Sequence, residues 1–219
     1  MVIILKRKLI LLVLIIIVLI MPSSITFREK KYYINYSKKY TIISNYQVGL
    51  IKILGTSFKE VVVQTTDNSF FLEHDIYGNH SNIGSIFLDY RNSLVDQKLI
   101  IYGHNSKQIK EAPFHFLEKF LDEKYSDTHP YLLFETTTHD TYYKLFTVMI
   151  VKDDLQHINL NWTSASYYQH LLWLKNNSLF TLNTNITKKD SIIIFQTCYY
   201  KPENSYLLLG FKKIAEKKK

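Results

Sequence analysis

Two apolar runs of the sequence each end at a side chain that could take part in covalent chemistry. Residues 99–105 read LIIYGHN and residues 192–198 read IIIFQTC, so one run leads to His104 and the other to Cys198, the single cysteine of the chain. Such runs are typical of buried strands, and a strand end holds a side chain firmly at the rim of a sheet. A thiolate is a strong nucleophile, and an imidazole within reach transfers its proton. If the two strands are neighbours, the pair predicts acyl transfer from a peptide bond.

A structural interpretation of the same two residues stays open. A lone cysteine in an apolar neighbourhood is commonly a small buried hydrophobe, and a histidine after a glycine is commonly a turn residue. The other histidines have no metal-binding spacing, and the carboxylates show neither an EF-hand nor a paired arrangement. The sequence also has no Gly-rich phosphate loop and no GxSxG motif. We therefore expect no metal and no cofactor.

Short β-branched and apolar segments predict a mainly β fold. The expected strands are residues 48–54, 61–64, 86–88, 98–102, 131–134, 142–151, 191–195 and 206–211. Two amphipathic helices are expected between them, around residues 114–122 and 164–175, the second capped by Thr163 or Ser164 and with Tyr168, Leu171 and Leu172 on one face. Many short strands with two inserted helices favour a closed or nearly closed β structure.

Composition indicates one domain with a basic character. The chain has 219 residues, 47% of them hydrophobic, which is enough for one well-cored domain but not for two. Part of the net charge of +8 lies in two terminal clusters, residues 6–8 and 217–219, so the charge is weak support for nucleic-acid binding and we expect none. A basic, Tyr-rich surface suits membrane lipid or cell-wall polymer, and an ordinary basic surface is an equally open interpretation.

The N-terminus has the pattern of a targeting signal. Residues 9–21 are apolar without a break, follow Lys6-Arg7-Lys8, and end without a small-residue cleavage site. This pattern favours an uncleaved signal-anchor over residues 1–26, with cleavage and secretion as the alternative. The positive-inside rule then predicts a single-pass cell-membrane protein with a cytoplasmic N-terminus, a membrane-proximal helix or stalk over residues 27–47, and an extracytoplasmic domain. In that oxidising setting Cys198 has no partner within the chain, so its thiol is expected to be free unless it pairs with another chain.

Four ordered motifs resemble the class B sortases of Gram-positive bacteria. They are DNSFFLEHD at residues 67–75, GSIFLDYRN at 84–92, IYGHN at 101–105 and TC at 197–198, and the resemblance spans about residues 49–210. It implies a closed sortase-type β-barrel over residues 48–214, with an N-terminal helical segment, a helix-bearing connection before the cysteine strand, and a basic tail at residues 215–219. Membrane anchoring by an uncleaved signal is also usual in that family.

The resemblance implies a cysteine transpeptidase. Cys198 would attack the Thr carbonyl of a C-terminal sorting signal of the Asn-Pro-x-Thr-x type on a secreted protein, and His104 would act as general acid and base. The acyl group would pass to an amine of a peptidoglycan precursor or of a pilin. Asn105, Thr197 and the helix at residues 164–175 would help to form the substrate groove, and the N-terminal anchor would contact membrane lipid.

One residue of the family pattern is missing. The family has a catalytic arginine on the strand after the cysteine, but residues 198–210 read CYYKPENSYLLLG, with Ser205 or Tyr206 at the expected position. A guanidinium offers a fixed charge and a fork of donors, whereas a Tyr hydroxyl offers one neutral donor. Losing one oxyanion donor costs about 10²–10³ in rate.

Several interpretations of that departure stay open. Tyr206 could serve as a weaker donor, Lys201 or Lys212 could supply a charge from another position, or the protein could bind sorting signals or cell wall without efficient turnover. A more remote hypothesis is a Cys/His wall peptidase that uses water as the acceptor.

Overall fold

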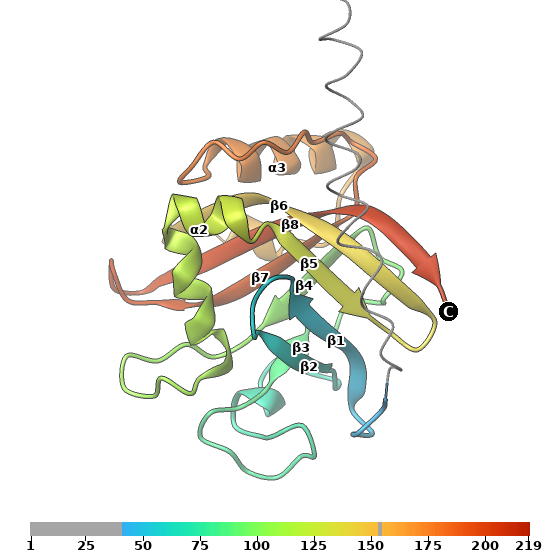
Figure 1. Cartoon of the computed structure of the whole chain (residues 1–219), viewed down its shortest axis with the longest axis vertical. Helices are drawn as coiled ribbons and strands as arrows, with labels where there is room; N and C mark the ends of the chain where they lie inside the picture. Colours follow the sequence, from blue (N-terminus) through green and yellow to red (C-terminus); the bar gives the residue numbers. More distant parts are fainter. Residues whose placement is uncertain (1–40, 153–154) are drawn as a thin grey trace, which may run out of the picture. The chain divides into compact units, whose positions relative to one another are not determined.

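The chain forms a closed eight-strand barrel in the computed structural model, which describes residues 41–152 and 155–219 (Figure 1). The strands are β1 (Gln47–Ile53), β2 (Lys59–Val63), β3 (Ile86–Leu88), β4 (Lys98–Tyr102), β5 (Tyr131–Glu135), β6 (His139–Lys152), β7 (Ile192–Tyr199) and β8 (Ser205–Lys218). Their order around the barrel is β1-β2-β3-β4-β7-β8-β6-β5. The predicted mainly β fold with a closed barrel is confirmed, and each of the eight expected strands lies within or across one of these elements.

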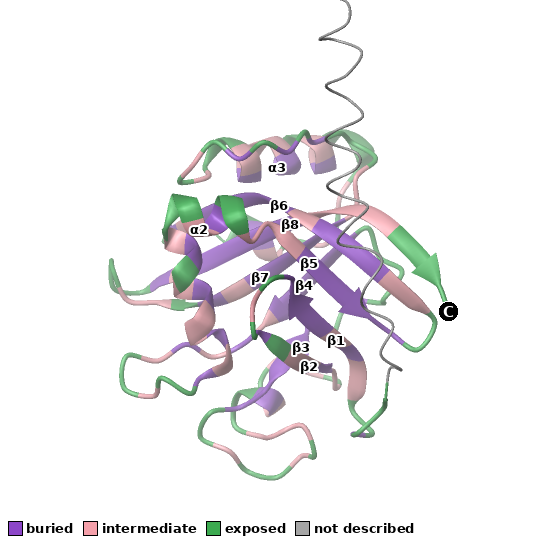
Figure 2. Ribbon diagram, in the orientation of Figure 1, coloured by how far each residue is buried: buried purple, intermediate pink, exposed green. Residues whose placement is uncertain are grey.

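Both faces of the cysteine strand are buried, which explains its unbroken apolar run. Ile193 and Phe195 belong to the cluster that fills the barrel, whereas Ile192 and Ile194 belong to a second cluster on the outer face, beneath helix α3 (Ser164–Asn176). Figure 2 shows buried residues along the barrel strands and on the side of α3 that faces them. Packing on both faces therefore fixes the position of this strand as far as Phe195.

The helices differ in detail from the expectation. The segment around residues 114–122 is a 3₁₀ helix, η2 (Pro113–Leu121), followed by the short α-helix α2 (Glu123–Thr128). Two further 3₁₀ turns are η1 (Phe70–Leu72) and η3 (Gln156–Ile158). Of the two caps considered for α3, Thr163 is the one used, in a reciprocal capping box with Ser166.

The buried face of α3 is not the predicted one. Tyr167, His170, Leu171 and Leu174 are buried, whereas Tyr168 and Leu172 are only partly buried. Apolar residues surround most of this helix, so their spacing does not single out one face. The contact with the outer surface of the barrel decides the rotation of the helix instead.

The structure corrects the predicted localisation. The longest helix among residues 41–152 and 155–219, α3, has 13 residues, and none of the helices described is long and apolar enough to cross a membrane, which takes about 20 residues. This finding contradicts the predicted single-pass membrane protein and leaves the expected contact with membrane lipid without support. The expected signal-anchor at residues 1–26, and the stalk up to residue 40, lie outside the described residues.

The residues expected to form a basic C-terminal tail belong to a strand. Strand β8 continues to Lys218, and its last residues pair with the start of β6, Lys217 with Asp140 and Lys218 with His139. The ammonium of Lys219 also lies 2.9 Å from a carboxylate oxygen of Asp140. The terminal lysines are therefore part of the barrel wall.

Candidate active site

His104 follows the end of β4, and Cys198 lies near the end of the neighbouring parallel strand β7. Strands β4 and β7 are paired so that Tyr102 lies opposite Gln196, and the amide of Gly103 donates a hydrogen bond to the Gln196 carbonyl at 3.3 Å. His104 and Cys198 each follow two residues later, at the same edge of the barrel. The parallel register therefore brings together two residues that are far apart in the sequence.

The Cys198 thiol is exposed at the edge of the barrel and makes no contact with the His104 imidazole among the described residues. Cys198 alternates with the inward-facing Phe195 and Thr197, so it points to the outer face, and the residue is exposed. Neighbouring atoms nevertheless desolvate the sulfur in part, and this burial raises the pKa of the thiol above its ordinary value. Among the described residues no hydrogen bond joins the thiol to the His104 imidazole. Cys198 is thus an exposed residue whose thiol pKa is raised by partial burial of the sulfur.

The His104 imidazole is oriented by a backbone carbonyl. Its Nε2 lies 2.7 Å from the carbonyl oxygen of Leu72, the last residue of η1, and because a carbonyl only accepts, Nε2 carries the hydrogen. Nδ1 is then the nitrogen left to exchange a proton. With the hydrogen on Nε2, the unprotonated Nδ1 is the atom that can accept a proton, as a general base must.

Gly84 makes this contact possible. It adopts a positive φ of 60°, and a Cβ atom there would lie 2.6 Å from the Leu72 carbonyl oxygen and 3.0 Å from Cδ2 of His104. Only glycine fits such a backbone conformation beside another backbone atom. Our sequence reasoning did not single out Leu72 or Gly84 as site residues, although both belong to motifs that carry the family resemblance.

Asn105 and Thr197, expected to line a substrate groove, are buried supports instead. The Asn105 amide donates to Glu118 Oε1 at 2.7 Å and to the Cys198 carbonyl at 3.2 Å, and its oxygen lies 2.9 Å from Nδ1 of His115. The Thr197 hydroxyl donates to the Gly103 carbonyl at 2.7 Å. Each residue is 2% exposed, so neither side chain is available to a substrate. Both fasten the cysteine strand to β4 and η2.

The two candidates for the arginine position lie on opposite faces of β8. Tyr206 is paired directly with Cys198, so their side chains share the outer face, about 5 Å apart at Cβ. Ser205 is 2% exposed, and its hydroxyl donates to the carbonyls of Pro202 and Tyr199 within the β7–β8 turn. Only Tyr206 faces the thiol's side of the sheet.

A polar network of Asp89, Arg91 and Tyr102 lies on the same outer face and was not predicted from the sequence. Asp89 accepts two hydrogen bonds from Arg91 and one from the Tyr102 hydroxyl, at 2.6–2.9 Å. Burial alone would raise the pKa of Asp89, but these hydrogen bonds and the Arg91 charge outweigh it and lower the pKa. Arg91 also donates to the Ile158 carbonyl at 3.0 Å. The network ties η3 to the strand that leads to His104.

A second contact joins η3 to the cysteine strand. His157 is fully buried, its Nε2 lies 2.7 Å from Oε1 of Gln196, and its ring centroid lies 6.2 Å from that of Tyr206. Gln196 and Tyr206 flank Cys198 on the outer face. The segment that carries η3 therefore borders the candidate site.

Within residues 41–152 and 155–219, no group of three His, Cys, Asp or Glu side chains is placed to hold a metal ion.

Comparisons with known proteins point to one family. No protein-family model matches the sequence. The chain is 31% identical over 154 residues to sortase B of Listeria monocytogenes, covering 69% of this chain and 62% of that relative. The chain thus spans less than two thirds of the length of this curated relative.

Solved structures agree with that similarity. Sortase B of Clostridium perfringens superimposes with a TM-score of 0.73 and 27% identity, over 78% of this chain and 94% of that one. A Staphylococcus aureus sortase B–substrate complex and a sortase B complexed with triglycine each superimpose with a TM-score of 0.71 and 28% identity, over 77% of this chain and 80% of those chains.

Proposed function

Because the chain belongs to the class B sortase family, we propose that it is a cysteine transpeptidase with Cys198 as nucleophile and His104 as general acid and base. The observation that carries the proposal is the parallel register of β4 and β7, which sets the ends of the two strands side by side. The accessible thiol and the single free imidazole nitrogen of His104 support these roles.

The proposed reaction consists of two acyl transfers. In the first, Nδ1 of His104 takes the proton of the Cys198 thiol, and the resulting thiolate attacks the Thr carbonyl carbon of an Asn-Pro-x-Thr-x sorting signal. A carbon–sulfur bond forms, the peptide carbon–nitrogen bond breaks, and His104 gives the added proton to the departing amine. In the second, His104 takes a proton from an incoming amine, whose nitrogen attacks the thioester carbon and releases the thiolate. The substrate and triglycine complexes of related proteins support a substrate protein and an amine, from a peptidoglycan precursor or a pilin, as partners.

Tyr206 is the proposed substitute for the missing arginine. Its position opposite Cys198 lets a hydroxyl donor approach the oxyanion of the tetrahedral intermediate. Lys212 does not serve, because it pairs with Ile192, about 20 Å along β7 from Cys198, and its ammonium is bound to the Asn185 carbonyl and to Asp190. A single neutral donor predicts slow turnover.

A second function is supported by the state of the thiol. A raised thiol pKa and a neutral donor at the arginine position are both unfavourable for catalysis. In this alternative the protein binds sorting signals or cell wall without efficient turnover. Binding would then survive the loss of the sulfur.

The test uses the full chain and a fluorogenic Asn-Pro-x-Thr-x peptide, with and without triglycine as acceptor amine. Cleavage by the parent that disappears in Cys198→Ala and in His104→Ala, together with a ligated product when triglycine is present, supports the transpeptidase. Thermal denaturation of each variant checks folding. Peptide binding without cleavage in the parent, unchanged in Cys198→Ala, supports the binding function instead, and neither cleavage nor binding contradicts both.

A further inference from the structure

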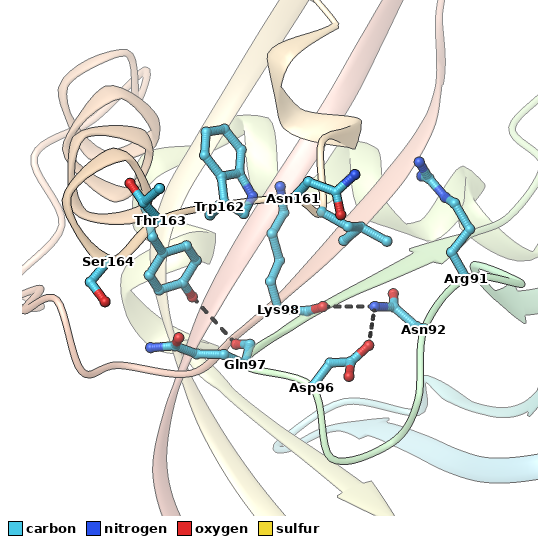
Figure 3. Close-up of a pocket in the computed structure, with 11 residues that line it drawn as sticks. Arg91, Asn92, Asp96, Gln97, Lys98, Asn161, Trp162, Thr163 and Ser164 are labelled. Atoms are coloured by element: carbon cyan, nitrogen blue, oxygen red, sulfur yellow. Dashed lines mark hydrogen bonds between the residues drawn. The ribbon is translucent and has the colours of Figure 1, made fainter.

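A polar cavity lies behind the segment that borders the candidate active site. It has a volume of about 530 Å³ and opens between the loop before β4 and the N-terminus of α3. Figure 3 shows the Lys98 side chain extending toward Trp162 and Asn161, while Asn92 donates hydrogen bonds to the Lys98 carbonyl and to Asp96. None of the residues assigned to catalysis lines it, so the cavity is separate from the Cys198 site.

One chain segment forms a common wall between the cavity and the active site. Within residues 156–162, His157 contacts Gln196 and Tyr206 on the Cys198 side, whereas Asn161 and Trp162 line the cavity. The Lys98 ammonium holds this wall by donating to the carbonyls of His157 and Asn159, at 2.7 and 2.9 Å. A ligand in the cavity would therefore lie next to the substrate site without entering it.

The cations of the cavity are already neutralised or occupied. Arg91 is paired with Asp89 in a two-pronged ion pair. The Lys98 ammonium donates to two carbonyls and lies 2.9 Å from Nε2 of His170. These three contacts occupy all three hydrogens of the ammonium. Asp96 adds a negative charge to the lining of the cavity. This balance does not favour an anionic ligand.

What remains for a ligand is an aromatic surface with mixed hydrogen-bonding groups. His170 stacks on one face of Trp162, with centroids 4.4 Å apart and planes at 18°, the Lys98 ammonium lies 5.4 Å from the ring centroid, and the indole N–H donates to the Asn159 carbonyl. The partly buried ring also lines the cavity. The Asn161 side chain, which is exposed and makes none of the hydrogen bonds seen among the described residues, offers a donor and an acceptor. A flat apolar surface beside paired donors and acceptors matches a ring that has one apolar face and a rim of hydroxyls.

We propose that this cavity binds a pyranose unit of a glycan, stacked on Trp162 and hydrogen-bonded by Asn161 and Asp96. The sugar site depends only on the cavity. Its role, to hold the glycan part of a cell-wall acceptor while the acceptor amine enters the Cys198 site, rests on the proposed transpeptidase function.

The binding test uses N-acetylglucosamine trisaccharide as probe with the full chain, measured by calorimetry and by tryptophan fluorescence. Trp162→Ala is expected to weaken binding about tenfold or more, and Asn161→Ala about threefold to tenfold, because each removes one contact of the ring. Trp173→Ala is the matched control, since Trp173 packs near the far side of His170, at 5.8 Å between centroids, and does not line the cavity. It should bind as the parent does.

The outcomes separate this proposal from the transpeptidase. Absence of trisaccharide binding by the parent, equal binding by Trp162→Ala and Asn161→Ala, or a preference for inorganic phosphate overturns the sugar site. Cleavage of the sorting peptide without acceptor is expected to stay within about twofold of the parent in Asn161→Ala, because that side chain lines the cavity and has no contact with Cys198 or His104. Loss of cleavage in every protein tested would instead contradict the transpeptidase and leave the binding result standing.

Discussion

Tyr206 is paired directly with Cys198 across strands β7 and β8 and presents its side chain on the same face of the sheet. The sequence alone left this position between Ser205 and Tyr206, and the register resolves the choice because Ser205 turns into the β7–β8 turn. The residue opposite the proposed nucleophile is the natural place for an oxyanion donor on β8.

Replacing Tyr206 tests its role. Tyr206→Arg is expected to raise the kcat/KM of sorting-peptide cleavage, by up to about 10²–10³, because a charged fork replaces one neutral donor. Tyr206→Phe should lower it, since only the hydroxyl is lost. Steady-state kinetics with thermal denaturation of both variants decides the matter, and equal rates in parent and Tyr206→Phe would rule out the hydroxyl as donor.

The reactivity of the Cys198 thiol is expected to rise with pH. Burial raises the Cys198 pKa, so at neutral pH the thiolate fraction is smaller than that of an ordinary cysteine, and it grows as the pH rises through the elevated pKa. Iodoacetamide alkylation, followed by mass spectrometry between about pH 6 and 10, should therefore have its midpoint above that of N-acetylcysteine amide, a cysteine with both ends blocked, under the same conditions. A midpoint below the reference would show that an unrecognised partner stabilises the thiolate.

The orientation of the His104 imidazole is expected to depend on the absence of a side chain at Gly84. Gly84→Ala puts a Cβ atom against the Leu72 carbonyl at a positive φ, so we expect a loss of about 1–3 kcal/mol in unfolding free energy and a larger fall in cleavage, because the carbonyl that orients His104 must move.

Gly78→Ala is the matched control for that change. Gly78 also has a positive φ, of 87°, but its added Cβ would meet only the Tyr46 side chain, at 3.2 Å. Urea denaturation and kcat should show a stability loss without a selective loss of activity. A Gly84→Ala protein with parental kcat would argue against the oriented imidazole.

His170 predicts a pH-dependent stability. Burial, with the nearby Lys98 charge, lowers the His170 pKa to about 3, whereas in the unfolded chain it returns to about 6.5. Between these values the unfolded state binds the extra proton, so stability rises with pH, by up to about 1.4 kcal/mol per pH unit, and is lost as the pH falls from about 6.5 towards 3.

A neutral substitution isolates this contribution. His170→Gln keeps an acceptor for Lys98 but does not titrate, so its unfolding free energy, measured against pH by urea denaturation, should have a shallower slope over that range than the parent's. His80→Gln changes an exposed histidine and is the control. Parallel slopes in parent and His170→Gln would contradict the buried neutral imidazole.

The sequence by itself determined the strands and pointed to two candidate reactive residues. Runs such as residues 192–195 are β-branched and apolar, and a strand is a local consequence of such composition, so all eight strands were predictable. The Thr163 cap was likewise among the local signals. Cys198 and His104 could be proposed as a pair because each stands at the end of such a run.

Only the tertiary structure decided which side chains meet. The parallel pairing of β4 with β7, the register of β7 on β8 and the rotation of α3 depend on contacts between distant segments, and a shift of one residue along a strand exchanges its two faces. For that reason Asn105 and Thr197 proved to be buried supports, Leu72 and Gly84 were found beside His104, and Tyr206 rather than Ser205 faces the thiol.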